Sequence, residues 1–188
     1  MVGGRVPITT VSPSCQSTSE ATHYRAFRNR EREVVERSVA RLQNSGFYWG
    51  PLSMGVAHEK INKEPVGTFL VRDSSQHHHL FTLSVRMAGG PVSVRVAFHK
   101  GRFWLREHSA DCLVKLLELV VDRTRIRPIC CENGIRLVLT KPLRCSRPLS
   151  LQELCRREIV RVYGHELLSQ LPLQPVLRRY VEAFPFKI

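Results

Sequence analysis

An arginine ends an apolar run and is followed by two serines in Gly67-Thr68-Phe69-Leu70-Val71-Arg72-Asp73-Ser74-Ser75. Side chains alternate between the two faces of a strand, so Phe69 and Val71 point one way while Leu70 and Arg72 point the other. Both faces carry apolar residues, which predicts a central strand covered on each side. Arg72 is therefore expected to be buried, although its guanidinium keeps its charge and is costly to bury unpaired.

Arg72 consequently needs either an acid of the protein or a bound anion. Asp73 points to the opposite face and is a poor partner, whereas the planar fork of a guanidinium suits a phosphate. Ser74 and Ser75 offer hydroxyl and backbone donors to the same oxygens. For this fragment taken alone, an internal salt bridge is an equally good interpretation, because structural arginines at strand ends are common.

The surrounding sequence predicts an α+β domain in which two helices flank an antiparallel sheet. An amphipathic helix is expected over residues 33–45, since Val35, Val39 and Leu42 recur at helical spacing and Gly46 follows as a stop. A helical stretch near residues 53–62 comes next. Strands are expected at residues 68–72, 80–86 and 92–98, and a short closing strand at 135–140.

A second long helix is expected after residue 109, with Ser109 as its N-cap. Its buried stripe consists of Leu113, Leu116, Leu117, Val120 and Val121. Towards the C-terminus, one more helical face carries Leu151, Leu154, Cys155, Ile159 and Val162. Prolines and a glycine cut the remainder into short helices. A unit of about 40 residues is marginal on its own, so this apolar stripe is expected to need a partner.

Composition restricts the classes of function. The chain has 188 residues, of which 43% are hydrophobic, enough for one good core with appendages. Its net charge of +13 predicts anionic partners. The arginines are scattered over three segments and no basic helix alternates with exposed aromatics, so nucleic acid is not the expected partner. No apolar run reaches the roughly 18 residues of a membrane span, so membrane insertion is not expected either.

Catalytic and metal sites are not predicted. The chain has six cysteines, and the polar start of the chain does not resemble a signal peptide, so reduced thiols in an intracellular protein are expected. His77-His78-His79 and Cys130-Cys131 lack the paired spacing of zinc ligands. No Gly-rich phosphate loop, nucleophile elbow or convergent acid pair is present. We therefore expect neither an enzyme nor a bound cofactor or metal.

The order of motifs resembles a known family. Phe47-Tyr48-Trp49-Gly50-Pro51, the Arg72 strand, Phe81-Thr82-Leu83-Ser84-Val85 and a basic strand ending in Gly101-Arg102-Phe103 follow the order of an SH2 domain. Thr22-His23-Tyr24-Arg25-Ala26-Phe27-Arg28 precedes it, and Ser150-Leu151-Gln152-Glu153-Leu154-Cys155 with Ile159 follows it. This three-part order resembles the suppressor of cytokine signalling family.

The resemblance implies an SH2 domain with an N-terminal helical extension and a small, all-helical C-terminal SOCS box. The implied division is a disordered leader at 1–20, a kinase inhibitory region at 21–32, an extended SH2 helix at 33–46, the SH2 domain at 47–143 and the SOCS box at 148–188. The C-terminal division agrees with the separate helical face noted above.

In the SH2 domain, the resemblance implies that Arg72, Ser74 and Ser75 bind phosphotyrosine. Many SH2 domains carry a histidine beside the phosphotyrosine ring. Ala97 stands at the matching position here, with Arg95 and His99 nearby, so the origin of the ring contact is left open.

The segment before the SH2 domain resembles the kinase inhibitory region of some family members. The resemblance implies that its residues occupy the peptide groove of a Janus kinase as a pseudosubstrate; they are His23, Tyr24, Arg25, Phe27 and Arg28. Tyr24 stands where the family tends to have phenylalanine, and its phosphorylation is an open question. A disordered basic leader is the alternative interpretation.

In the SOCS box, the resemblance implies an elongin-binding helix with Leu151, Cys155 and Ile159 along one face. An ordinary core helix packed on the SH2 domain is the alternative. The implied cullin-contacting residues are Leu171, Pro172, Leu173 and Pro175. Gln174 replaces the usual second proline, so weak cullin recruitment is expected.

These features together predict a negative-feedback inhibitor of cytokine and JAK-STAT signalling. The implied partners are Janus kinases, phosphorylated cytokine receptors, elongin B, elongin C and a cullin, which would make the chain the substrate-recognition subunit of a ubiquitin ligase. A cytoplasmic location is expected, with a nuclear fraction left open. The main alternative is a plain phosphotyrosine adaptor, and a basic nucleic-acid-binding protein is an alternative of another class.

Overall fold

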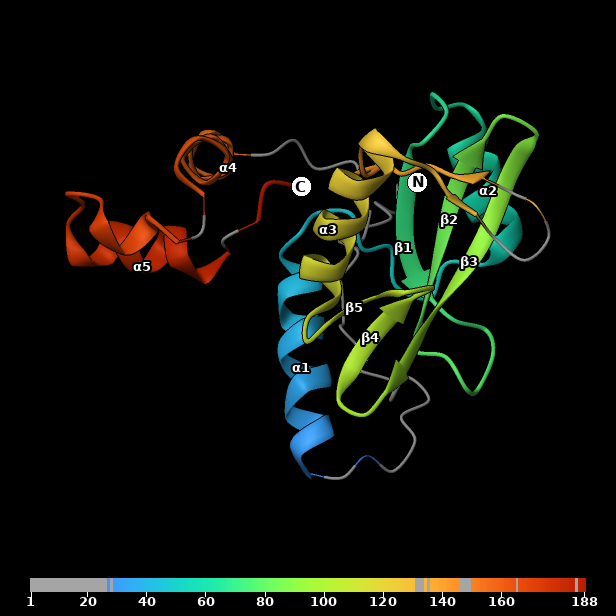
Figure 1. The fold of residues 1–188 in the computed structure, drawn as a ribbon, viewed down its shortest axis with the longest axis horizontal. Coiled ribbons are helices and arrows are strands. Elements are labelled where there is room, and N and C mark those ends of the chain that lie inside the picture. Colours follow the sequence, from blue (N-terminus) through green and yellow to red (C-terminus); the bar gives the residue numbers. More distant parts are fainter. Residues whose placement is uncertain are drawn as a thin grey trace, which may run out of the picture.

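A five-stranded antiparallel sheet forms the centre of the molecule, with the strand order β1-β2-β3-β4-β5 (Figure 1). The computed structural model describes residues 27, 29–130, 134, 136–145, 150–164, 166–184 and 186–188. The strands are β1 Phe69–Asp73, β2 Phe81–Met87, β3 Gly90–His99, β4 Arg102–Leu105 and β5 His108–Ala110. A separate pair is formed by β6 Ile129–Cys130 and β7 Arg136–Leu137. The expected closing strand is thus present in part, and the leader at 1–20 lies outside the described residues.

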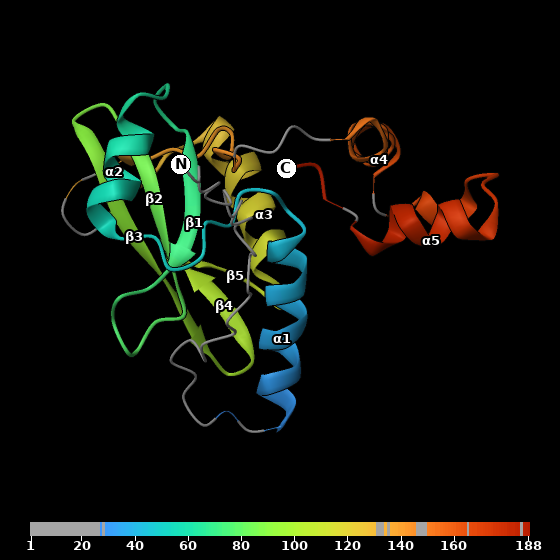
Figure 2. The same ribbon diagram turned by 180° about the vertical axis from the view of Figure 1, so that it is seen from behind.

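Helices cover both faces of the sheet, as the sequence predicts. The helices α1 Asn29–Gln43 and α3 Leu113–Ile126 pack with Phe69 and Val71 in the main core. The short helix α2 Met54–Asn62 packs with Leu70 on the other face. Figure 2 shows the sheet between α2 on one side and α1 with α3 on the other. The predicted division of the β1 side chains between two faces is confirmed, and so is the buried stripe of the second long helix.

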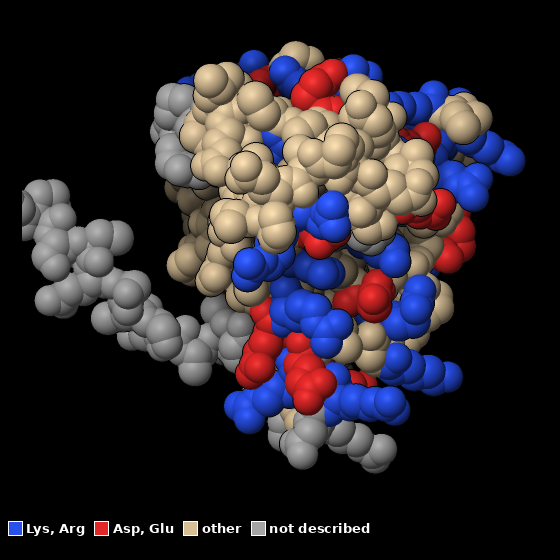
Figure 3. Space-filling view, turned by 90° about the vertical axis from the view of Figure 1, so that its left-hand side faces the viewer, with Lys and Arg blue, Asp and Glu red and all other residues tan. Residues whose placement is uncertain are grey.

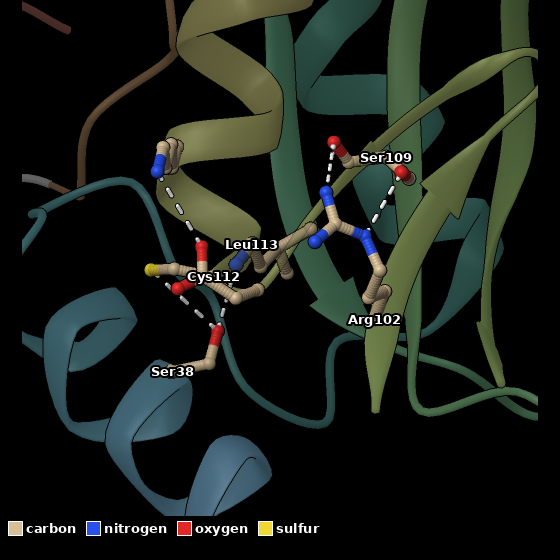
Figure 4. Close-up of polar contacts among 7 residues, drawn as sticks. Ser38, Arg102, Ser109, Cys112 and Leu113 are labelled. Atoms are coloured by element: carbon tan, nitrogen blue, oxygen red, sulfur yellow. Dashed lines mark hydrogen bonds and ion pairs between the residues drawn. The ribbon is translucent and has the colours of Figure 1, made fainter. Parts of the chain in front are cut away.

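The predicted N-cap of the second long helix is wrong. Ser109 lies in β5, where it pairs with Trp104 and its Oγ accepts a hydrogen bond from Arg102 Nε at 3.1 Å (Figure 4). The chain extends as a strand here, so α3 begins only at Leu113. Its first free amide is satisfied from another helix, since the Leu113 N–H donates to Ser38 Oγ of α1 at 2.8 Å.

The C-terminal helices form a second, smaller cluster. Helix α4 Leu151–Tyr163, a 3-10 turn at Leu168–Gln170 and α5 Pro175–Ala183 pack around Val160, Leu168 and Val181. Beyond α5 the chain returns towards α1 and α3 (Figure 1). There the side chains of Phe184, Phe186 and Ile188 join the main core. None of the helices in the described ranges is long and apolar enough to cross a bilayer.

Candidate functional site

Arg72 lies on the α2 face of the sheet and is only 3% exposed. Its Nε donates to Ser84 Oγ, its Nη1 to the carbonyl of Asp73 and its Nη2 to Ser93 Oγ, each at 3.2 Å. All three acceptors are neutral. Hydroxyls and a carbonyl hold the fork in place but leave its charge uncompensated.

A second guanidinium, that of Arg95, acts on Arg72. Burial, and secondly the field of Arg95, lower the pKa of Arg72. The ion pairs among the described residues do not include Arg72. Asp73 points away to Tyr48, whose hydroxyl donates to Asp73 Oδ1 at 2.5 Å. Within the described part of the chain, Arg72 is therefore a buried cation without the internal salt bridge that the fragment left open.

Arg72 and Arg95 belong to one row across three strands. Arg72 pairs with Thr82 of β2, and Thr82 pairs with Arg95 of β3. Residues that are directly paired in an antiparallel sheet lie on the same face. Thr82 is buried between the two arginines, and Arg95 is exposed. Two guanidiniums in one row, with hydroxyls between them, suit a doubly charged anion such as a phosphate monoester. We call Arg72, Thr82, Ser84, Ser93 and Arg95 the anion socket.

His58 of α2 borders the anion socket. Its Nε2 lies 2.9 Å from Ser93 Oγ, so a chain of hydrogen bonds links His58 through Ser93 to Arg72. Burial, and secondly the Arg72 cation, lower the pKa of His58. The neutral imidazole is thus the favoured form beside the guanidinium.

The loop after β1 places the two predicted serines differently. Ser74 is buried, and its Oγ accepts a hydrogen bond from the Gln76 N–H at 3.2 Å. Ser75 is exposed. The loop returns to the sheet at His79, whose Nδ1 lies 3.3 Å from the carbonyl oxygen of Val96 on β3. The loop therefore borders the same part of β3 as the anion socket.

Helix α4 exposes an apolar face. Leu151 is 77% exposed, Cys155 is also exposed and Ile159 is half-buried. Figure 3, viewed from the side of α4 and α5, shows a broad area free of Lys, Arg, Asp and Glu in the upper part of the molecule. Other exposed apolar side chains of this unit are Leu154, Val162, Tyr163, Leu167, Val176 and Leu177. The core-helix alternative requires this face to pack on the sheet domain, but Leu151 and Cys155 are exposed instead.

Comparisons with known proteins match both parts of the chain. The SH2 domain model matches residues 47–119, and the SOCS box model matches residues 147–182. Suppressor of cytokine signaling 1 of Homo sapiens is 49% identical over 170 residues, which are 89% of this chain and 75% of that protein. The chain belongs to the suppressor of cytokine signaling family. Suppressor of cytokine signaling 2 of Homo sapiens is 35% identical, covering 82% of each chain, and suppressor of cytokine signaling 3 of Gallus gallus is 35% identical, covering 76% of this chain and 79% of that protein.

The SH2 domain of this family member therefore contains the anion socket, and its SOCS box carries the exposed apolar face of α4. Sequence reasoning identified Arg72 but did not identify His58, Ser84 or Ser93 as its neighbours. A signal was present, because Thr82 and Ser84 alternate with the apolar Phe81, Leu83 and Val85. That alternation indicates a polar face, which α2 covers.

Only one of the predicted kinase inhibitory residues is described. Phe27 is half-buried, and its ring contacts Phe98 of the SH2 core edge-on, with centroids 5.5 Å apart. His23, Tyr24, Arg25 and Arg28 lie outside the described residues.

The predicted cullin-contacting residues run from the end of the 3-10 turn to the first residue of α5. Leu171 and Leu173 pack against the SOCS box cluster, whereas Pro172 and Pro175 are exposed. Gln174 is the N-cap of α5, and its side chain forms no capping hydrogen bond. The described residues contain no group of three or more His, Cys, Asp or Glu that could hold a metal ion.

Proposed function

We propose that this protein suppresses cytokine signalling by binding phosphotyrosine through its SH2 domain and by linking the bound protein to a ubiquitin ligase through its SOCS box. The observation that carries the proposal is the burial of Arg72 among neutral acceptors. Removing a guanidinium from water is costly, and a phosphate monoester would supply the missing negative charge. Recognition of phosphorylated peptides by arginine is the general mode of SH2 domains.

Phosphotyrosine binding is tested by calorimetry with a peptide from a phosphorylated Janus kinase or cytokine receptor. Arg72→Lys keeps the charge but removes the fork, so we expect at least about 100-fold weaker binding. Arg86→Lys is the matched control, because Arg86 lies on the same face but donates to the Asn62 carbonyl at the end of α2. Equal affinities of Arg72→Lys and the wild type would overturn this arm of the proposal.

The second arm is direct inhibition of a Janus kinase by the segment His23 to Arg28. Its support is the aromatic and basic composition of the segment and the contact of Phe27 with Phe98 of the SH2 core, which would tether the strip to the SH2 domain. Linked sites raise each other's effective concentration. We expect Phe27→Ala and Arg25→Ala to abolish inhibition of a purified kinase domain while phosphopeptide binding persists. Inhibition that survives both changes would show that this segment is not the inhibitory element. Absence of inhibition by the wild type, with phosphopeptide binding intact, would leave an SH2-guided adaptor.

The third arm is recruitment of elongin B and elongin C by α4. The exposure of Leu151 and Cys155 supports a helix-in-groove contact in which a small thiol fits a tight pocket. Cys155→Phe should therefore prevent co-purification with the elongin pair. Cys130→Phe changes another exposed cysteine, in β6, and should leave it intact. Weak binding of a cullin is expected because of Gln174, and Gln174→Pro should strengthen it.

A further inference from the structure

An aromatic side chain, that of Trp104, lies on the same sheet face as the anion socket. Arg95, Ala97 and His99 follow one another on this face of β3, while Val96 and Phe98 point into the core between them. Ala97 pairs directly with Trp104 of β4. The indole therefore lies on the face that holds Arg72 and Arg95, opposite the core residues of its own strand, Phe103 and Leu105.

The indole of Trp104 is held in place before any ligand arrives. Its ring stacks on the imidazole of His99 with centroids 4.7 Å apart and an interplanar angle of 20°. Its Nε1–H donates to the His99 carbonyl at 3.4 Å. Trp104 is half-buried, as is Ala97, so part of its surface stays open beside a residue that contributes only a methyl group.

The spacing suits an aryl phosphate. Ala97 lies about 7 Å along the strand from Arg95, and Trp104 lies about 5 Å beyond Ala97 on the next strand. A phosphate held between Arg72 and Arg95 would restrict its attached ring to the neighbouring sheet surface. The strands β1 to β4, which the structure describes in full, carry no acidic residue on this face.

We propose that Trp104, braced by His99, forms the surface that contacts the phosphotyrosine ring in this SH2 domain, in place of a large side chain at Ala97. The inference rests on phosphotyrosine binding by the domain and adds the residue that distinguishes an aromatic phosphate from an aliphatic one. Offset stacking of aromatic groups contributes modestly to binding, which corresponds to an effect of about tenfold in affinity.

The test compares two ligands on the full chain. Trp104→Ala should weaken binding of phosphotyrosine amide about tenfold but change binding of phosphoserine amide less than about twofold. Trp104→Phe should retain most of the affinity for phosphotyrosine. Ser109→Ala is the matched control, since Ser109 pairs with Trp104 one strand farther from Ala97. Adding Ala97→His to Trp104→Ala should restore part of the lost affinity by supplying another ring at the same place.

Fluorescence gives a second measurement that does not require a stable alanine variant. The chain contains two tryptophans, so Trp49→Phe leaves Trp104 as the reporter. Its emission should change on addition of phosphotyrosine amide and not with phosphoserine amide. The inference would be overturned if Trp104→Ala lost equal affinity for both ligands, or if the emission stayed unchanged when phosphotyrosine amide binds. In either case, weaker binding by Arg72→Lys would still uphold the proposed function. Failure of the wild type to bind phosphotyrosine would overturn both.

Discussion

Arg72 shows how a single residue is prepared for a ligand at the cost of an unbalanced charge. Its hydrogen bonds to Ser84 and Ser93 orient the fork, and neither hydroxyl can neutralise it. His58 completes the arrangement through Ser93 without adding a charge, because its pKa is lowered by burial and by Arg72. The arrangement therefore leaves a positive charge that an anion would neutralise.

The lowered pKa of His58 predicts how stability depends on pH. The folded state favours neutral His58, whereas the unfolded chain takes up a proton as pH falls through about 6.5, the ordinary value. The unfolded state then binds more protons, so the free energy of unfolding should decrease as pH falls below about 6.5. His58→Gln keeps a partner for Ser93 but does not titrate, so it should show a smaller decrease. Urea unfolding at about pH 7.5 and 5.5 measures both slopes, and identical slopes would contradict the prediction.

Gly67 illustrates a residue required by backbone conformation. Its φ is +87°, and an added Cβ would lie 2.6 Å from Thr140 Cγ2 and 2.8 Å from Thr140 Oγ1. Gly67→Ala should cost about 2 to 4 kcal/mol, from the left-handed conformation and the clash together. Gly55→Ala in α2 meets nothing within 4 Å and should be neutral or stabilising. Urea unfolding of both variants checks the difference, and equal stabilities would show that Thr140 simply moves aside.

At the scale of elements, the two faces of the sheet are covered unequally. Two long helices bury the apolar face, whereas one short helix of the described chain, the nine-residue α2, packs on the polar face. A short helix can bury Arg72 and still leave Arg95 and Trp104 open to a ligand. The long helices are tied to each other by a buried polar contact at Ser38 (Figure 4).

Ser38 replaces the side-chain cap that α3 lacks. It is 1% exposed, its Oγ accepts the Leu113 N–H at 2.8 Å, and the N-cap residue Cys112 forms no side-chain cap. Ser38→Ala should destabilise the domain by about 1 to 3 kcal/mol, because a buried N–H loses its partner. The control Ser53→Ala removes the exposed N-cap of α2 and should cost about 1 kcal/mol or less. Urea unfolding, with hydrogen exchange at Leu113, measures the effect, and a smaller loss for Ser38→Ala than for Ser53→Ala would refute it.

At the scale of the whole molecule, the last residues of the chain join the SOCS box to the SH2 domain. Phe186 is buried in the main core, with the guanidinium of Arg41 5.7 Å from its ring centre. The Lys187 N–H donates to Glu118 Oε1 of α3 at 2.6 Å, and Arg157 of α4 donates to the Lys187 carbonyl at 3.4 Å. The tail therefore contacts both parts, which predicts that their stabilities are coupled.

Phe186→Ala should destabilise the SH2 domain although the residue belongs to the C-terminal segment. Removing a buried phenylalanine typically costs about 3 to 5 kcal/mol. Lys187→Ala is the control, since its side chain is exposed and its backbone hydrogen bonds are kept. Thermal unfolding should show a lower Tm for Phe186→Ala and no change for Lys187→Ala. An unchanged Tm in both would mean that the tail contributes little to the SH2 core.

Periodicity along the chain predicted a helix over residues 33–45, where the structure has α1 Asn29–Gln43, and a second one after residue 109, where α3 spans Leu113–Ile126. It also predicted the two faces of β1, because side-chain direction follows directly from backbone conformation. The buried position of Arg72 also followed from its place on an apolar strand. Motif order was enough to predict the family. These features depend on residues close together in sequence, or on their order.

The partners of Arg72 could not be predicted in the same way, because Ser93 and His58 reach it from β3 and α2 and their positions depend on sheet register and helix docking. Ser109 was misassigned because a serine before an apolar stripe is also compatible with a strand, and pairing with β4 determines which of the two forms. The burial of Phe186 and the place of Trp104 beside Ala97 likewise arise from long-range packing. Local pattern specifies which side of an element is apolar, and only the assembled fold determines what that side meets.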